Sequence, residues 1–154
     1  MTQRIMPAIW CGAVDEAAEY YAETFSDASV VDQLPGLAAT VEVGGFKFSL
    51  VGGDDSYAPN PSISGILNFD PLLFGDEKQA RSHLDELYER LSVGGVLREL
   101  GEYPFSRRYA WVRDRFGFTW QLMLTDPAGE PRPFIVPSFM FGGPNHLHAE
   151  EATT

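Results

Sequence analysis

Residues 103–122 read YPFSRRYAWVRDRFGFTWQL, and this stretch carries the strongest structural signal in the chain. Aromatic residues are frequent on both sides of its centre, and such residues favour β-strands. The turn formers Asp114 to Gly117 lie between the two sides. The stretch therefore predicts two strands, at 107–113 and 118–124, that are joined by a tight turn.

An amphipathic helix precedes these two strands. It is expected over 77–92, because Asp76 with Gln79 three residues later resembles a capping box. A strand at about 62–69 precedes this helix, and a short strand near 95–99 follows it. The apolar stripe of the helix consists of Ala80, Leu84, Leu87, Tyr88 and Leu91.

The first half of the chain repeats this order of elements. Gly44 and Gly45 are expected to form a hairpin turn, because glycine tolerates the positive φ angles that two-residue turns need. Two such units can roll their sheets into a half-barrel with a central cleft. We therefore expect an α+β fold of two βαβββ modules that form a half-barrel sheet with the helices outside. The first-half elements are a strand at 4–12, a helix at 14–25 and strands at 28–33, 37–43 and 46–51.

The tract from Tyr103 to Leu122 resembles the closing hairpin of PhnB-like proteins, which are often labelled demethylubiquinone methyltransferase-like. These proteins are a branch of the vicinal oxygen chelate superfamily, also called the glyoxalase and bleomycin-resistance superfamily. The opening of this chain, from Met6 to Phe25, is similar to the first strand and helix of the same family. The resemblance covers residues 4–125. It implies paired βαβββ modules, a homodimer, and a cleft lined by strand residues.

The resemblance and the composition together divide the chain into three parts. Residues 1–125 are expected to form the glyoxalase-like domain, with modules at about 4–51 and 62–124. The Pro-rich residues 126–133 are the expected linker, and 134–154 are a C-terminal strand and tail that resemble the start of a further module. We expect residues 134–141 to form a strand that docks on its own domain or, by exchange, on the partner subunit.

Metal-dependent relatives in this superfamily use four strand positions as His or Glu ligands. The resemblance matches these positions with Met6, Ser49, Ser64 and Gln121. A thioether, two hydroxyls and an amide are poor ligands for a divalent catalytic metal. We therefore predict no metal site and no cofactor. His146 and His148 in the tail lack further fixed donors.

The methyltransferase label can be tested against the sequence. Methyl donors are usually held by a Gly-rich turn between a strand and a helix, and Val41 to Phe46 is the only candidate. This segment leads into another strand-like run, which favours a hairpin over a cofactor loop. The sequence therefore does not favour methyl transfer.

Strand parity predicts which residues face the cleft. Taking Gln121 as cleft-facing, we expect Met6, Ala8, Ile66 and Met123 to line the cleft with the candidate ligand-binding residues. Residues of the opposite parity should pack under the helices: Phe46, Phe48, Leu50, Phe118, Trp120 and Leu122. The candidate ligand-binding residues are Trp10, Lys47, Ser49, Asn68, Thr119 and Gln121.

Each candidate has a structural alternative. Trp10 can be a core residue, and Asn68 and Gln121 can satisfy neighbouring backbone groups. No general base is evident, because His83 lies off the apolar stripe of its helix. Cys11 lies in an apolar run, which favours a buried thiol over a reactive one. The catalytic residues, if any exist, are unknown from the sequence.

Composition excludes several classes of partner. The net charge is −11 and the isoelectric point is about 4.5, so nucleic acid and anionic membranes would be repelled. Arg107, Arg108, Arg113 and Arg115 form one basic cluster, which is either a solvated strand edge or a surface for an anionic ligand. The apolar runs are too short for a membrane span, and Met1 to Ile5 lacks a signal-peptide core. We expect a cytoplasmic protein.

Three functions remain open at this stage. The leading hypothesis is a metal-independent small-molecule binding protein, such as a resistance or sequestration factor, whose homodimer builds the pocket. The alternative is a lyase, isomerase or dioxygenase that acts on a small oxygenated metabolite. The third is a structural interaction module in which side chains fill the cleft.

Overall fold

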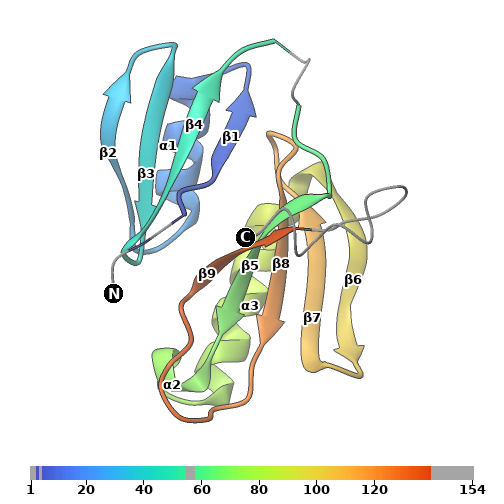
Figure 1. Cartoon of the computed structure of the whole chain (residues 1–154). Helices are drawn as coiled ribbons and strands as arrows, with labels where there is room; N and C mark the ends of the chain where they lie inside the picture. The colour runs from blue at the N-terminus through green and yellow to red at the C-terminus, as the bar shows by residue number, and fades with distance from the viewer. Residues whose placement is uncertain (1–2, 4, 55–57, 140–154) are drawn as a thin grey trace, which may run out of the picture.

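A computed structural model describes residue 3 and residues 5–54 and 58–139. The first module contains one helix and a four-stranded sheet in the order β1-β4-β3-β2 (Figure 1). β1 runs parallel to β4, and the other neighbours are antiparallel. Its elements are β1 (Ala8–Cys11), α1 (Val14–Thr24), β2 (Ala28–Leu34), β3 (Ala38–Val43) and β4 (Phe46–Gly52).

The second module repeats this arrangement and adds one strand. Its sheet has the order β6-β7-β8-β5-β9, in which β5 runs parallel to β8 and antiparallel to β9. Its elements are β5 (Ile63–Phe69), α2 (Pro71–Phe74), α3 (Glu77–Leu91), η2 (Ser92–Gly94), β6 (Gly95–Tyr103), β7 (Ser106–Arg113), β8 (Thr119–Leu124) and β9 (Ile135–Phe139).

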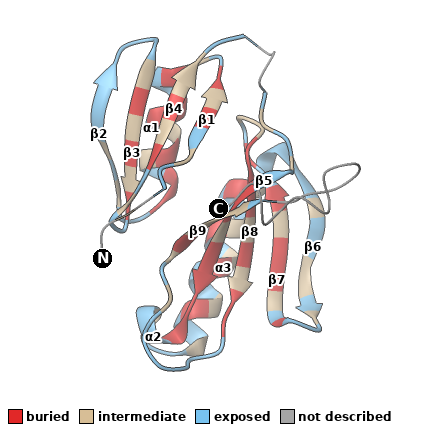
Figure 2. Ribbon diagram, in the orientation of Figure 1, coloured by how far each residue is buried: buried red, intermediate tan, exposed pale blue. Residues whose placement is uncertain are grey.

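The predicted α+β class with two βαβββ modules and an extra C-terminal strand is confirmed. Within the described residues the strands form two sheets that are not hydrogen-bonded to each other. α1 covers one face of the first sheet and α3 one face of the second (Figure 1). Buried residues concentrate in the inner strands, whereas β2 and β6 at the sheet edges are largely exposed (Figure 2).

Local sequence signals account for several element boundaries. The Asp76 carboxylate accepts a hydrogen bond from the Gln79 backbone N–H at 2.8 Å, as the capping signal predicts. Gly44 and Gly45 have φ angles of 54° and 86° and join β3 to β4. The predicted hairpin is therefore confirmed at this position, and the segment leads into a strand instead of a helix.

The sequence missed two features of the second module. β6 extends over nine residues, to Tyr103, and not only to 99 as predicted. Its pairing with β7 is irregular and its side chains are mostly exposed, so the alternation that marks a regular strand is weak. The short helix α2 was not predicted either; Asp70 caps it by accepting from the Leu72 N–H at 3.0 Å.

One buried carboxylate connects the two modules. Asp114 in the β7–β8 turn is 1% exposed and accepts from the Tyr21 hydroxyl of α1 at 2.5 Å and from the Trp120 indole N–H at 2.8 Å. It also accepts from the backbone N–H groups of Phe116 and Phe118. Burial raises the pKa of Asp114, and these hydrogen bonds act in the opposite direction.

Candidate functional site

The second sheet has one face under α3 and one face turned away from it, which we call the open face. Residues of one parity, including Leu67, Trp120 and Leu122, lie in the core. The opposite parity forms the open face. Its residues are Ser64, Ile66 and Asn68 on β5, Thr119, Gln121 and Met123 on β8, and Tyr109, Trp111 and Arg113 on β7.

A chain of hydrogen bonds crosses three strands on the open face. The Tyr109 hydroxyl donates to Gln121 Oε1 at 2.5 Å, and Gln121 Nε2 donates to Ser64 Oγ at 2.8 Å. Burial raises the pKa of Tyr109 to about 12, so the phenol stays protonated and acts as a donor. The two bonds together hold the Gln121 side chain in place between Tyr109 and Ser64.

An aromatic cluster at the β6–β7 hairpin adjoins this series of hydrogen bonds. The rings of Tyr103 and Phe105 are stacked with centroids 5.7 Å apart, and the Tyr109 ring lies edge-on to both. Phe105 is 59% exposed. A large aromatic side chain that is both ordered in a cluster and exposed is a typical element of a binding surface.

A hollow of about 420 Å³ lies beside this cluster, within the size range of small-molecule sites. Two buried polar atoms on this side of the sheet have no hydrogen-bond partner in the described structure: Thr125 Oγ1, whose residue lines the hollow, and Trp111 Nε1. Orphan groups of this kind are uncommon. The hollow is lined by Asn68, Glu102, Tyr103, Pro104, Phe105, Ser106, Arg107, Met123, Leu124, Thr125, Asp126 and Arg132.

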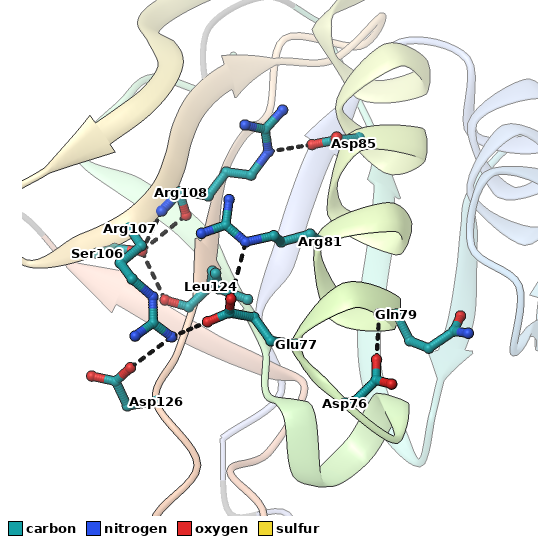
Figure 3. A network of polar contacts seen from close by, with 10 residues as sticks. All are labelled: Asp76, Glu77, Gln79, Arg81, Asp85, Ser106, Arg107, Arg108, Leu124 and Asp126. Carbon is teal, nitrogen blue, oxygen red and sulfur yellow. Dashed lines mark hydrogen bonds and ion pairs between the residues drawn. The ribbon is translucent and has the colours of Figure 1, made fainter.

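The arginines near the hollow are already paired with carboxylates. Arg107 pairs with Asp126 at 3.0 Å and with Glu77 of α3 (Figure 3). Arg108 binds Asp85 of α3 at 2.5 Å, also visible in Figure 3. Two of the four arginines of the predicted basic cluster, Arg107 and Arg108, are therefore paired with carboxylates, which argues against a surface for an anionic ligand beside the hollow.

The structure divides the six predicted site residues between the two sheets. Asn68, Thr119 and Gln121 lie on the open face of the second sheet. Trp10, Lys47 and Ser49 lie on the first sheet, at positions that alternate with the buried residues Ile9, Phe48 and Leu50.

Several of these residues have structural partners, as the alternative interpretation expected. The Trp10 indole N–H donates to the Asp54 backbone oxygen at 3.0 Å. Asn68 Nδ2 donates to the Pro133 oxygen at 2.9 Å, which ties down the segment before β9. Thr119 is fully buried and its hydroxyl lies 3.4 Å from the Ile63 oxygen. Lys47 is exposed.

The four positions matched with metal ligands do not form a donor set. Ser64 and Gln121 do come together, but the serine oxygen accepts from the amide and the amide oxygen accepts from Tyr109. Met6 is 51% exposed, and Ser49 lies on the other sheet. No cluster of three or more His, Cys, Asp or Glu suited to a metal exists in the described part of the chain. These residues do not fit a divalent metal. His146 and His148 lie outside the described residues.

Two other reactive groups are unsuited to chemistry at this site. Cys11 is 6% exposed, and burial raises the pKa of its thiol, which keeps it protonated. His83 is exposed on α3 with its ring 4.9 Å from the Phe74 ring, away from the open face. Both findings agree with the structural alternatives considered for these residues.

Sequence reasoning missed Tyr109, Phe105 and Thr125 as candidate site residues. A signal for Tyr109 was present: the turn at 114–117 fixes the register, which pairs Tyr109 with Met123 and Trp111 with Gln121. Thr125 is two residues after Met123, so the alternation that places Gln121 and Met123 on the open face also places Thr125 on that side. Phe105 carries no comparable signal, because it lies in the turn between β6 and β7.

Comparisons with known proteins agree with this architecture. The family model described as 3-demethylubiquinone-9 3-methyltransferase matches residues 3–123. No curated protein matches the chain. No helix in the described part of the chain is long and apolar enough to cross a membrane.

Solved structures show the same fold at low sequence identity. The PhnB protein of Bacillus cereus is 23% identical with a TM-score of 0.67, over 80% of this chain and 100% of that one. A glyoxalase-related enzyme of Fulvimarina pelagi is 16% identical with a TM-score of 0.58, over 89% and 99%. A bleomycin-binding protein in complex with bleomycin is 14% identical with a TM-score of 0.51, over 80% and 99%. The chain shares the fold of these PhnB, glyoxalase-related and bleomycin-binding structures, and it belongs to the 3-demethylubiquinone-9 3-methyltransferase family.

Proposed function

We propose that this protein is a metal-independent small-molecule binding protein whose ligand lies on the open face of the second sheet and in the adjoining hollow. The observation that carries this proposal is the hydrogen-bond chain from Tyr109 through Gln121 to Ser64. It holds polar groups in fixed positions beside an aromatic cluster. Fixed polar groups beside aromatic side chains are characteristic of ligand sites.

The lining indicates the kind of ligand. The stacked Tyr103 and Phe105 rings suit a flat apolar group. The Asn68 carboxamide, with its nitrogen bound to Pro133, keeps its oxygen for a ligand donor. Because the nearby guanidinium groups are paired with carboxylates, a charged ligand gains little. We therefore propose a neutral oxygenated molecule with an aromatic or similarly flat part.

The donor chemistry supports binding without a metal. Ser64 and Gln121 are the two matched metal-ligand positions that lie together. The side-chain oxygen of each already accepts a hydrogen bond from a neighbouring side chain. Neither oxygen carries a charge. A divalent ion could bind these oxygens only if the hydrogen bonds from Tyr109 to Gln121 and from Gln121 to Ser64 were broken. Neither oxygen would give the ion an anionic ligand.

The family description names a methyltransferase, but the site favours binding over methyl transfer or acid–base catalysis. The Gly44–Gly45 turn joins two strands and does not lead into a helix, so it is unsuited to cradle a methyl donor. The nine open-face residues include no His, Asp or Glu, and Tyr109 holds its proton strongly. The hollow has two carboxylates, Glu102 and Asp126, and Asp126 is paired with Arg107. The bleomycin complex of a structurally similar protein is consistent with a binding role.

We also propose a cytoplasmic homodimer, in which Trp10, Lys47 and Ser49 of the first sheet contribute to the same pocket. These three residues lie at cleft-facing parity on the first sheet. A dimer with an exchanged C-terminal strand is the alternative form of this assembly. The crosslinking experiment described below distinguishes the two.

The test combines ligand screening with metal analysis on the full chain. We expect thermal-shift screening to find stabilising molecules among neutral phenols, aryl ketones and benzamides, since a ligand that binds only the folded state raises the melting temperature. The stabilisation should be lost in Gln121→Leu and kept in Val93→Ala, a change at an exposed site elsewhere. Equilibrium dialysis with Zn²⁺, Mn²⁺ and Ni²⁺ should show no stoichiometric binding. Tight binding of one ion that Gln121→Leu abolishes would overturn the metal-independent reading.

A further inference from the structure

The fifth strand of the second sheet lies beyond the part of the chain that the family model matches. That model ends at residue 123, whereas β9 spans Ile135–Phe139. The similarity to the Bacillus cereus protein covers all of that protein but only 80% of this chain. β9 thus lies outside the part that the family model matches, and its contacts indicate what it does.

β9 covers the edge of β5 with both backbone and side-chain contacts (Figure 1). The Asn68 N–H donates to the Phe134 oxygen at 2.8 Å, next to the Asn68–Pro133 side-chain bond. Ile135 is 4% exposed within the core, and the Phe134 ring packs edge-on to Phe69. The strand is therefore firmly docked.

Without β9, the edge of β5 would be free to pair with another β-strand. Residues Ile63–Phe69 read ISGILNF, which contains no charge and no proline. Uncharged strands with open edges pair readily with other strands. The other edge of β5 is bound to β8, so β9 is the element that covers this one.

The position of Pro137 ends the sheet at β9. In an antiparallel pair, N–H groups alternate between pointing at the neighbour and pointing away. Because Asn68 bonds to Phe134, the same register makes 66–136 and 64–138 the bonded pairs. The backbone N–H groups of residues 135 and 139 then point away from β5. Residue 137 has the same backbone orientation, but it is proline and has no N–H. β9 binds β5 and presents a poor edge to any further strand.

We propose that β9 is an intramolecular cap that prevents the β5 edge from pairing with a second copy of this chain. A second copy is the partner that fits best, because two identical β5 edges can pair antiparallel about a two-fold axis and satisfy each other equally. No charged side chain on β5 opposes this pairing. The inference concerns only this edge and does not depend on the proposed ligand function.

Crosslinking tests whether the cap is intramolecular. Ile63 and Phe139 are directly paired and are each 45% exposed, so Ile63→Cys with Phe139→Cys should form a disulfide without disturbing the core. Cys11 is buried and does not compete. We expect the oxidised double variant to migrate as a single chain under denaturing conditions, with the Ile63→Cys single variant as control. Covalent dimers would show that the strand is exchanged and would overturn the intramolecular cap.

Proline placement tests the capping role in the full chain. Val136→Pro removes an N–H that points at β5, whereas Phe139→Pro removes one that points outward. We expect Val136→Pro to release β9 and to double the native mass in analytical ultracentrifugation, and Phe139→Pro to keep the wild-type mass. A peptide of residues 131–139, PRPFIVPSF, should reverse the doubling, and the same peptide with proline at 136 should not. An unchanged mass for Val136→Pro would overturn the proposal. Larger species whose mass the peptide does not reduce would also overturn it.

Discussion

At the scale of single residues, the buried Asp114 carboxylate accepts four hydrogen bonds. Its carboxylate accepts from two side chains, Tyr21 and Trp120, that belong to different modules. It also closes its own turn through the Phe116 and Phe118 amides. A buried carboxylate tolerates burial only when such donors replace water. The sequence marked Asp114 as a turn former, but the buried tyrosine that reaches it lies 93 residues away.

The Tyr21 hydroxyl should therefore contribute measurably to stability. Tyr21→Phe removes the hydroxyl that donates to the Asp114 carboxylate at 2.5 Å. It leaves the ring contacts with Phe48 and Trp120 in place. We expect the free energy of unfolding to fall by about 1.5–3 kcal/mol, because the acceptor is a buried carboxylate. Urea denaturation measures this change. Tyr20→Phe is the matched control, since that hydroxyl bonds to an exposed backbone oxygen at 3.2 Å; equal losses in the two variants would contradict the prediction.

At the scale of elements, the parts of the fold that depend on local chemistry were predictable and those that depend on register were not. The β7–β8 hairpin, the Gly44–Gly45 turn and the cap of α3 each rest on residues within a few positions of one another. The length of β6 was not predictable, because its irregular pairing hides the alternation. Gln121 was identified by its match with a ligand position of metal-dependent relatives, and the parity of the other strand residues was set from it. Its partner Tyr109 follows only from the register that the 114–117 turn sets between β7 and β8, which the pattern of either strand alone does not contain.

The α3 helix allows a comparison of two of its own polar contacts. Asp76 caps the helix by accepting from the Gln79 N–H, whereas Asp85 pairs with Arg108 on a partly exposed surface (Figure 3). We expect Asp76→Ala to lower the free energy of unfolding by about 1 kcal/mol, the usual value of an N-cap. Asp85→Ala should change it by less, because exposed ion pairs contribute roughly 0–1 kcal/mol. Urea titrations in low and high salt check both, and only the Asp85 effect should shrink with salt. A larger loss for Asp85→Ala at both salt concentrations would refute this ranking.

At the scale of the whole molecule, the two sheets are separate but share one core. Trp120 of the second module packs edge-on against Tyr21, Phe25 and Phe48 of the first. Together with the Asp114 hydrogen bonds, these contacts bury the helix-facing sides of both modules in one cluster. Two modules that lack hydrogen-bonded strands between them are therefore joined by side chains.

This shared core predicts that the modules unfold together. Each module alone would expose part of this aromatic cluster, so partial unfolding is unfavourable. We expect urea unfolding curves followed by Trp fluorescence and by far-ultraviolet circular dichroism to coincide in a single transition. Trp120→Leu removes the ring that touches three aromatic residues of the first module, and we expect it to separate the two curves. Trp111→Leu, a change on the open face of the same sheet, should lower stability while the curves still coincide. Two resolved transitions in the wild-type protein would mean that the modules fold independently and that the contacts around Trp120 do not couple them.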